Sequence, residues 1–351
     1  MARLAPTLPA LRGGLLTLLA AVLFGVSTPL VQRFGVGLGA FSTAALLYAG
    51  AAAVGLLSRQ PAEREARLQR SDLPRLLAMA GFGAVVGPVA LAWGLQNTSG
   101  TSASLMLTLE ALFTAVLAWR LYRETMDGRV WAAMALILAG GVVLVLDQGR
   151  TGGAQLWGLL AVLLATAAWG VDNTLSRALA ERDPGQVVLA KALLGVTATT
   201  TLALAFGEPL PAVGAALALF AVGATGYGLS LRLYLLAQRA FGAARTGSVF
   251  AFAPFIGAAL ALALGDRTAS GLMALGSLLM LAGVVLHLAE SHGHEHGHDG
   301  LEHEHAHGHE DGHHEHLHDP MPTGEHNHAH RHEPLRHAHA HVPDAHHGHS
   351  H

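Results

Sequence analysis

Residues 136–146 read LILAGGVVLVL, and residues 278–288 read LLMLAGVVLHL, the same pattern 142 positions later. Both segments are apolar and marked by glycine, and neither alternates polar with apolar residues as a barrel strand does. A segment of this kind within a run of about 20 apolar residues is long enough to cross the hydrocarbon core of a bilayer. Because backbone groups in lipid must be hydrogen-bonded within the segment, the pattern predicts a membrane-spanning helix.

Similar apolar runs fill the chain on both sides of these two segments. Hydrophobic residues make up 52% of the 351 residues and charged residues 13%, about half the charged share of a soluble domain. We expect an all-α membrane protein with ten transmembrane helices and a first helix that is retained, not cleaved as a signal peptide. The predicted spans are 11–32, 36–57, 73–95, 101–120, 130–147, 156–177, 186–206, 212–236, 244–264 and 270–289.

A second pair of segments shows that the two halves of the chain repeat each other. LFGVSTPL (23–30) resembles AWGVDNTL (168–175) at an offset of 145 residues. Each repeat holds five predicted spans, and an odd number places the second repeat upside down relative to the first. Inverted repeats are the architecture of many secondary transporters, although a channel or a membrane enzyme can also carry repeats. We predict a first five-helix repeat over 1–147, a second over 156–290, and a tail over 291–351.

Arginine is distributed unequally between the two sides of the predicted spans. One side has three arginines, Arg33, Arg150 and Arg267, whereas the other has fourteen. The positive-inside rule therefore predicts a cytoplasmic N-terminus, and an even number of spans returns the C-terminus to the cytoplasm. The fourteen are Arg3, Arg12, Arg59, Arg64, Arg67, Arg70, Arg75, Arg120, Arg123, Arg129, Arg177, Arg182, Arg239 and Arg245. We expect a multi-pass protein of the cytoplasmic, or inner, membrane.

Two longer segments resemble a known family. GTSASLMLTLEALFTAVLAWRLYRET (100–125) and GAARTGSVFAFAPFIGAALALALGDR (242–267) each join a small-residue start, a long span and an acidic residue at a short turn. With the glycine-marked final spans, they resemble the drug/metabolite transporter superfamily, as a pair of EamA-type domains. The resemblance covers about four-fifths of the chain and implies a transporter, not an enzyme. The first repeat departs from the pattern, because Glu110 and Leu112 stand where Pro254 marks the second.

Ionisable side chains within the spans are the first candidates for function, because each costs several kcal/mol to insert. Glu110 lies in the middle of the fourth predicted span, and Asp172 and Asn173 lie next to each other in the sixth. We predict that Glu110 and Asp172 bind protons or substrate and that Asn173 supports them by hydrogen bonding. The alternative is a structural role, in which these groups are protonated or hydrogen-bonded and hold helices together.

Other polar side chains are candidates for the same cavity. Lys191 is the only lysine in the chain. Its ammonium group either reaches the membrane surface along its long stem or pairs with Asp172 or Glu110. Arg232 has the same two alternatives. The remaining candidates for lining the cavity are Tyr227, Gln96 and Gln238, although aromatic residues also serve as ordinary interface anchors.

The tail after the last span is rich in histidine. His287 is the only one of the 24 histidines before residue 292, so the tail holds 23. It has no apolar run, and we expect disorder in the absence of metal. Neutral imidazole binds Zn, Ni, Co and Cu, so we predict metal binding by the tail, while a proton buffer or a solubilising segment is the alternative. The first twelve candidate ligands are His292, His294, His296, His298, His303, His305, His307, His309, His313, His314, His316 and His318.

The composition also limits the cofactors and partners. The chain has no cysteine, which excludes a disulfide framework, an iron–sulfur site and a thiolate zinc site. We expect no required cofactor and no nucleic-acid partner; the partners are the lipid bilayer, a small-molecule solute and, through the tail, divalent transition metals. A second copy of the chain, as a homodimer, is left open.

These observations predict a secondary active transporter of small organic metabolites, driven by a proton or another ion gradient through alternating access. Two alternatives remain at this point. The first is a transition-metal transporter that uses the tail to deliver Ni, Co or Zn. The second is a membrane metal sensor or scaffold that transports nothing, in which the helices only anchor the tail. The substrate and the direction of transport do not follow from the residues.

Overall fold

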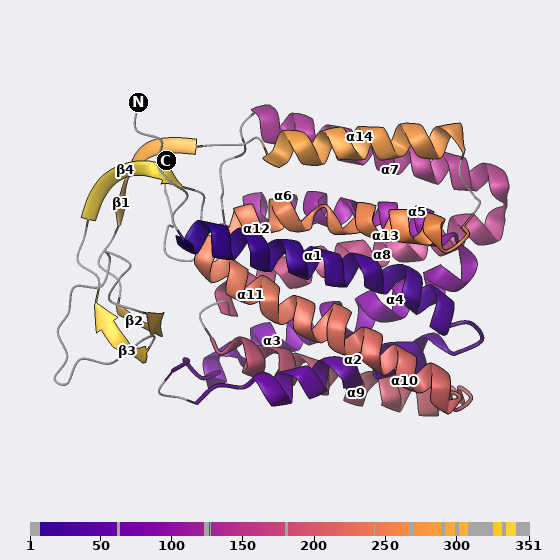
Figure 1. The fold of residues 1–351 in the computed structure, drawn as a ribbon, viewed down its shortest axis with the longest axis horizontal. Helices are drawn as coiled ribbons and strands as arrows, with labels where there is room; N and C mark the ends of the chain where they lie inside the picture. Colours follow the sequence, from indigo (N-terminus) through magenta and orange to yellow (C-terminus); the bar gives the residue numbers. More distant parts are fainter. Residues whose placement is uncertain are drawn as a thin grey trace.

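The computed structural model describes residues 8–61, 64–122, 126, 128–179, 182–241, 243–266 and 270–288, together with the backbone of four short tail segments. Ten of its helical stretches are long and apolar enough to cross a membrane, which confirms the predicted number of spans (Figure 1). Their bounds are Arg12–Phe34, Ala40–Ser58, Arg70–Asn97, Gly100–Leu121, Gly128–Arg150, Gly153–Leu179, Pro184–Ala205, Val213–Arg239, Thr246–Ala263 and Gly271–Leu288.

Six of the spans consist of one main helix, and four are divided. The undivided spans are α1 (Leu8–Phe34), α2 (Ala40–Ser58), α7 (Gly128–Thr151), α8 (Gly153–Ser176), α9 (Pro184–Ala205) and α14 (Gly271–Leu288). The third span consists of η1 (Arg70–Asp72), α3 (Leu73–Met79), the π-helix η2 (Ala80–Val86) and α4 (Gly87–Asn97). The eighth consists of α10 (Val213–Val222), the π-helix η4 (Gly223–Leu229) and α11 (Ser230–Phe241). A 3-10 turn, η3 (Arg177–Leu179), follows α8.

The fourth and ninth spans are broken in the middle. In the fourth, α5 (Gly100–Met106) is followed by α6 (Leu109–Tyr122), with a turn at Leu107 and Thr108 between them. In the ninth, α12 (Ala243–Phe250) and α13 (Ala253–Ala263) are separated by a turn at Ala251 and Phe252. The π-helices start 143 residues apart and the turns 144 residues apart, so each irregularity of the first repeat recurs in the second.

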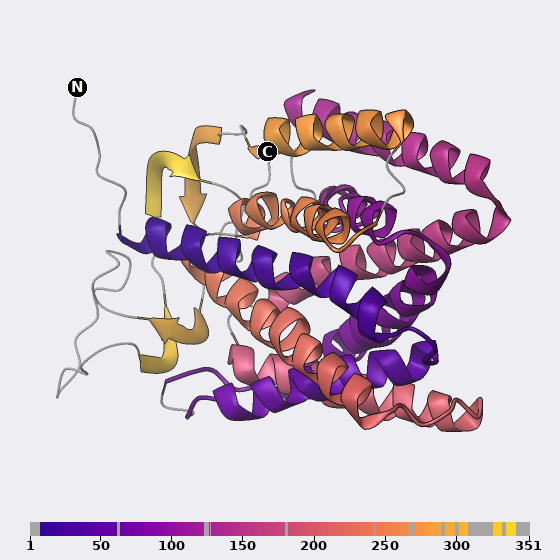
Figure 2. The same ribbon diagram turned by 45° about the vertical axis from the view of Figure 1, so that its right-hand side comes forward.

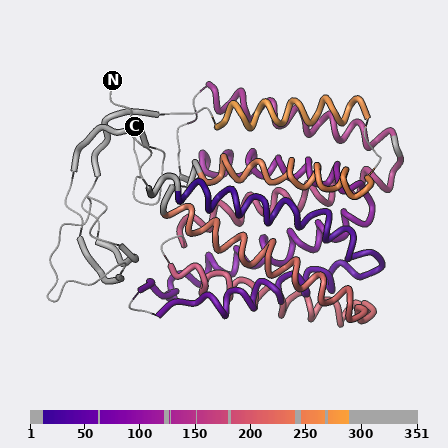
Figure 3. Tube along the Cα trace, in the orientation of Figure 1, coloured from indigo at the N-terminus to yellow at the C-terminus, as the bar shows by residue number. Residues whose placement is uncertain are grey.

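Helix packing follows the same repeat. Helix α4 packs on α8, and its counterpart α11 packs on α1; likewise α6 packs on α8, and its counterpart α13 packs on α1. The equivalent helices α2 and α9 pack on each other, as do α7 and α14. Figure 3 shows the indigo-to-magenta first repeat and the pink-to-orange second repeat interleaved, and in Figures 1 and 2 the α7–α14 pair lies along one edge of the molecule. The chain therefore folds as two inverted five-helix repeats, as expected.

Glycines at equivalent positions allow the repeats to approach closely. A Cβ atom on Gly50 of α2 would lie 2.0 Å from the carbonyl oxygen of Phe220, and one on Gly195 of α9 would lie 2.7 Å from the Cβ atom of Ala84. Each glycine brings its helix against the π-helical span of the other repeat. Because lipid tails are as apolar as leucine, packing of this kind, and not burial from water, holds the spans together.

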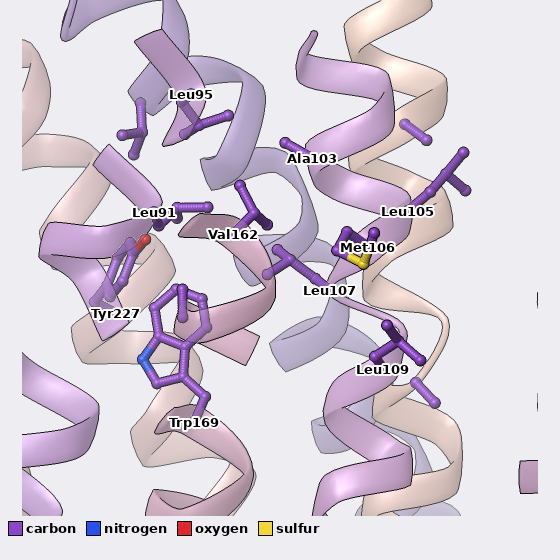
Figure 4. Packing of buried hydrophobic residues seen from close by; sticks show 14 of the residues in the cluster. Leu91, Leu95, Ala103, Leu105, Met106, Leu107, Leu109, Val162, Trp169 and Tyr227 are labelled. Atoms are coloured by element: carbon purple, nitrogen blue, oxygen red, sulfur yellow. The ribbon is translucent and has the colours of Figure 1, made fainter. Parts of the chain in front are cut away.

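Large apolar side chains fill the remaining space between the spans. Figure 4 shows Met106, Leu107 and Leu109 around the break in the fourth span, and Leu91, Val162, Trp169 and Tyr227 in the same cluster beside it. Leu107 is 2% exposed, so the turn is packed into the core although its backbone is irregular. Irregular backbone at this depth is tolerated only where protein or a water-filled cavity surrounds it.

Four short strands occur in the histidine-rich tail. β1 (His292–His298) pairs antiparallel with β4 (Leu335–His341), and β2 (Glu302–His307) pairs antiparallel with β3 (His326–Arg331). Most other tail residues lie outside the described part of the chain. The disorder expected of this tail without metal therefore stays a prediction.

Candidate functional site

In the π-helix of the third span, the backbone carbonyl of Gly83 is hydrogen-bonded by side chains of other helices. In η2 the N–H of Gly87 donates to the carbonyl of Phe82, five residues earlier. In that register the Gly83 carbonyl would be bonded by residue 88, which is Pro88 and has no N–H. Two side chains donate instead: the Tyr48 hydroxyl and, at 3.0 Å, the Trp169 indole N–H. The Gly83 carbonyl is thus held by residues of both repeats.

A buried ion pair lies beside this carbonyl. Lys191 of α9 donates to the Asp172 carboxylate of α8, and the two residues are 2% and 4% exposed. A Cβ atom on Gly83 would lie 2.3 Å from the carboxylate carbon of Asp172, so only glycine leaves room for this pair. The Lys191 ammonium group therefore points into the centre of the bundle and does not reach the surface along its stem.

The second carboxylate lies at the break in the fourth span. Glu110 is in the first turn of α6, where a helix favours negative charge, and it is half-buried. Its Oε1 accepts a hydrogen bond of 2.5 Å from the Asn173 side chain of α8. Asp172 and Asn173 are adjacent on one helix, so the structure connects Lys191, Asp172, Asn173 and Glu110 in sequence.

Aromatic rings pack around Trp169, which precedes Asp172 by one turn on α8. Phe24 of α1 contacts Trp169 edge to face at 5.6 Å between ring centroids, and Tyr227 of η4 at 6.0 Å. Tyr227 in turn lies 5.7 Å from Tyr48, and Figure 4 shows it beside Trp169. The group is extended by Phe250 and Tyr234. Ring pairs of this geometry each stabilise by about 0.5–1.5 kcal/mol beyond the area they bury.

The repeat makes the centre asymmetric. The offset of 145 residues between α1 and α8 matches Asp172 with Ser27 and Trp169 with Phe24. The contacts agree, because a Cβ atom on Gly83 would meet Asp172 and one on the equivalent Gly226 would meet the Ser27 Cβ atom at 2.4 Å. One copy of this position is therefore charged and the other is neutral.

The two ends of the bundle differ as well. We call the end where α2 finishes and the third span begins the arginine-rich end, and the end where α1 finishes and α2 begins the arginine-poor end. At the arginine-rich end, Arg182 contacts Asp72 at 3.0 Å and Arg239 contacts Glu65 at 2.8 Å. Asp72 and Glu65 are 3% and 8% exposed, which is unusual burial for carboxylates.

Backbone contacts reinforce these two ion pairs. Ala66 and Arg182 form a β-bridge, and the Asp183 N–H donates to the Ala66 carbonyl at 2.8 Å. The Arg239 guanidinium also donates to the Arg182 carbonyl at 2.6 Å. The loop that precedes the third span thus joins the first repeat to the second. We call Glu65, Asp72, Arg182, Arg239 and the bridge at Ala66 the loop latch.

The arginine-poor end is hollow instead. A cavity of about 830 Å³ opens there between the ends of the first, third, fourth, fifth, sixth and ninth spans. Nine of the sixteen residues that line it are polar, and two of these are charged, Arg33 and Asp266. Asp266 accepts from the Thr101 N–H at 2.9 Å and the Thr101 hydroxyl at 2.8 Å. The polar residues of the wall are Gln32, Arg33, Gln96, Asn97, Thr98, Ser99, Gln148, Gln155 and Asp266.

The residues predicted from the sequence fall into two groups. Glu110, Asp172, Asn173 and Lys191 lie together at the centre, with Tyr227 in the aromatic group. The others are Gln96, Gln238 and Arg232. Gln96 lines the cavity at the arginine-poor end and donates to the Leu38 carbonyl at 2.8 Å. Gln238 is buried next to Tyr234, and Arg232 is half-buried on α11. What these residues do remains a prediction.

Two features of the site were not predicted. The Gly83 carbonyl has a signal in the sequence, a proline five residues after a glycine, but the signal matters only when the helix is in the π register. The loop latch has no signal in the sequence. Asp72 and Arg182 are 110 residues apart, and the segments around them look like ordinary charged connections between spans.

The predicted metal ligands cannot be placed. His309, His313, His314, His316 and His318 lie outside the described residues, and for those of β1 and β2 the structure describes only the backbone. Elsewhere in the described chain, no group of three or more His, Cys, Asp or Glu side chains is arranged to hold a metal ion. Metal binding by the tail therefore stays a prediction.

Ten spans in two inverted repeats, with buried charges and broken helices at the centre, define a membrane transport protein. Two segments of the chain, residues 11–146 and 156–289, match the model of the EamA-like transporter family. The protein belongs to this family.

Two known proteins are similar to this chain. An uncharacterized transporter of Methanothermobacter thermautotrophicus (strain Delta H) is 29% identical over 230 residues, which cover 64% of this chain and 67% of the relative. A protein crystal structure superposes with a TM-score of 0.58 over 80% of this chain and 96% of its own, at 20% identity. That likeness concerns the fold alone.

Proposed function

We propose that the protein is a secondary active transporter that moves a small organic solute by alternating access. The observation that carries the proposal is the polar chain from the buried pair Lys191 and Asp172 through Asn173 to the half-buried Glu110. It crosses the space between the repeats at a helix break, where transporters of inverted-repeat architecture bind their substrates. A group of side chains that only held helices together would not need two carboxylates in a membrane interior.

The difference between the two ends supports alternating access. The loop latch ties the arginine-rich end together, while a cavity of about 830 Å³ opens at the other end. This arrangement fits a state that is accessible from the arginine-poor side. Because the repeats are inverted, exchanging their conformations would give the opposite state, in which the latch is broken.

The energy source and the placement in the cell follow from the same features. Glu110 and Asp172 are the protonatable groups, so a proton gradient is the proposed driving force. The positive-inside rule places the arginine-rich end, with both termini, in the cytoplasm of a cell with an inner membrane. The cavity would then face the outside of that membrane.

The test is transport by the purified, full-length protein in proteoliposomes. A panel of labelled amino acids, amines, organic acids and sugars is offered under pH gradients of either sign, to wild type and to Glu110→Gln and Asp172→Asn. We expect at least one solute whose flux depends on the gradient, with a loss of tenfold or more in both variants. Undiminished, pH-independent flux in both variants would remove the assignment.

The histidine tail gives a separate test of the metal alternatives. Removing residues 291–351 leaves every span and every residue of the central chain in place. We expect solute flux to persist, whereas a metal transporter supplied by its tail would lose Ni, Co or Zn flux. A protein that transports nothing while its tail binds metal would instead be a sensor or scaffold.

A further inference from the structure

The segment that joins the second span to the third, residues 59–75, has its acids buried and its arginines exposed. Glu65 pairs with Arg239 at 2.8 Å and Asp72 with Arg182 at 3.0 Å, so both carboxylates are neutralised by the second repeat. Within the described part of the chain, the guanidinium groups of the segment make no ion pair or hydrogen bond. We call the five exposed arginines the basic face: Arg59, Arg64, Arg67, Arg70 and Arg75.

The other carboxylates of this segment and of the loop that it contacts do not neutralise the basic face. Asp183, at the start of α9, is fully buried and accepts from the Gln60 N–H at 3.1 Å and the Gly185 N–H at 2.8 Å. Glu63 and Glu181 lie outside the described residues, so at most two further carboxylates oppose five guanidinium groups. Five positive charges against at most two negative ones leave the face with at least +3.

The backbone under the basic face is held in place by the second repeat. Ala66 forms its β-bridge with Arg182, and the Leu68 N–H donates to the Gln186 side chain at 3.2 Å. Together with the two ion pairs, these contacts fix the loop on the start of α9. A surface that is ordered beforehand binds a partner without the cost of ordering its own backbone. The basic face is therefore suited to an anionic segment.

The chain supplies such a segment at the same end of the bundle. An even number of spans brings the end of α14, at Leu288, to the arginine-rich end, and Figure 1 shows it on the same side of the bundle as the start of α3. In the tail that follows, residues 299–319 contain seven acids and no lysine or arginine. The acids are Asp299, Glu302, Glu304, Glu310, Asp311, Glu315 and Asp319. We call residues 299–319 the acidic segment.

The acidic segment is close enough along the chain to reach the basic face. An extended chain covers about 3.3 Å per residue, so the 23 residues from Leu288 to Asp311 reach up to roughly 75 Å. Neighbouring helices lie about 8–10 Å apart, so a bundle of ten is narrower than this reach. A tethered segment also has an effective concentration on the order of millimolar at a surface it can reach. Weak contacts are then enough to hold it.

We infer that the acidic segment of the tail docks on the basic face of its own chain. A single exposed ion pair contributes little, but here seven carboxylates on one segment meet five guanidinium groups on a fixed loop. Arginine also binds a carboxylate through two parallel hydrogen bonds, which favours it over a point charge. The docked tail would cover the loop that carries Glu65 and Asp72 and so reinforce the loop latch. The inference does not require that the protein be a transporter.

The test measures how fast each arginine reacts with 4-hydroxyphenylglyoxal, read by mass spectrometry of peptides. Full-length protein is compared with protein truncated after residue 290, in phosphatidylcholine nanodiscs at about pH 8, where imidazole is neutral. We expect the basic face to react at least threefold more slowly in the full-length protein at low salt, and equally fast in both at about 0.5 M salt. Arg33, exposed at the arginine-poor end, is the internal control and should not change. Equal rates at the basic face in low salt would overturn the inference.

A tail of unchanged length separates charge from bulk. The seven acids are replaced by amides, outside every span, so the membrane part of the chain is unaltered. The substitutions are Asp299→Asn, Glu302→Gln, Glu304→Gln, Glu310→Gln, Asp311→Asn, Glu315→Gln and Asp319→Asn. We expect the basic face of this variant to react as fast as that of the truncated protein. Protection that persists with the neutral tail would contradict docking by charge.

Anionic lipid is the other candidate for the basic face, and the same readout distinguishes it. Full-length and truncated proteins are compared again in nanodiscs that contain phosphatidylglycerol. If the full-length protein still reacts more slowly than the truncated one, the tail occupies the face. If the lipid slows the reaction of the truncated protein and the tail adds no further protection, lipid headgroups occupy the face in such a membrane and the inference is wrong.

Discussion

The arginine-rich and arginine-poor ends of the bundle are built from equivalent segments, yet one is closed and the other is hollow. At the poor end, Gln96 donates to the Leu38 carbonyl at 2.8 Å; at the rich end, the equivalent Arg239 donates to the Arg182 carbonyl at 2.6 Å. The contact is the same, but only the arginine also reaches a carboxylate, that of Glu65. The arginine therefore gives its end of the duplicated frame an ion pair that the glutamine does not make at the other end.

The largest effect should come from removing one charge of the latch. Asp72→Ala leaves Arg182, which is 17% exposed, without its carboxylate. Breaking a buried pair in this way costs about 3 kcal/mol of unfolding free energy, measured by denaturant unfolding in detergent. The Asp72→Ala/Arg182→Ala protein is the control and should be more stable than the single variant. Equal losses in both would show that the pair contributes nothing.

Weakening the latch without removing its side chains should open the closed end. Glu65→Gln with Asp72→Asn keeps the shape of both side chains and discharges them. The chain has no cysteine, so Ser176→Cys, 1% exposed in α8, and Gln155→Cys, in the cavity wall, report on the two ends separately.

In the otherwise unaltered protein, a membrane-impermeant maleimide should label Gln155→Cys and spare Ser176→Cys. With the latch discharged, we expect labelling of Ser176→Cys to rise about tenfold and labelling of Gln155→Cys to fall. A rise at both positions would indicate general loosening of the bundle, not an exchange of states.

A smaller effect is expected from the cap of α2 at the hollow end. Glu208 accepts from the Phe41 N–H at 3.1 Å and the Ser42 N–H at 2.7 Å, and so bonds the free donors at the start of α2. Glu208→Gln should lower the unfolding free energy by about 1 kcal/mol, because it weakens two charge-assisted hydrogen bonds. Labelling of Ser176→Cys should not change. A loss as large as that of Asp72→Ala would mean that both ends are equally strong.

The smallest effect is predicted for Gln96→Ala. Gln96 is exposed, and replacing such a side chain changes stability by about 0.5 kcal/mol or less. The equivalent Arg239→Ala should cost several times more, since it breaks an ion pair and a hydrogen bond together. Unfolding of the two variants under one set of conditions makes the comparison, and similar values would contradict it.

The number of spans and their inverted repeat were predictable because apolar runs of membrane length are a local property of the sequence. Charges within those runs were equally visible, and four of the predicted residues, Glu110, Asp172, Asn173 and Lys191, lie together in the structure. The position of Gln96 at one end was not foreseen. A glutamine near the end of an apolar run looks the same in the sequence whether it lines the end of the helix bundle or its centre.

The irregular backbone was the unpredictable part of the fold. Pro254 marks the break in the ninth span, but the equivalent break in the fourth has Glu110 in its place and no proline. Both π-helices are ordinary apolar sequence, and they pack against helices of the other repeat, η4 against α2 and η2 against α9. Features that are created by packing between distant segments leave no local pattern to read.

The burial of the only lysine has a consequence for the chemistry of the whole chain. Lys191 is 2% exposed and bonded to Asp172, so acylating reagents, which attack accessible uncharged amines, cannot reach it in the folded protein. Acylation at this residue therefore requires that the pair separate and the centre admit water. The rate at which the chain gains a single acyl group at Lys191 would measure how often its centre opens, with no label introduced and no residue changed.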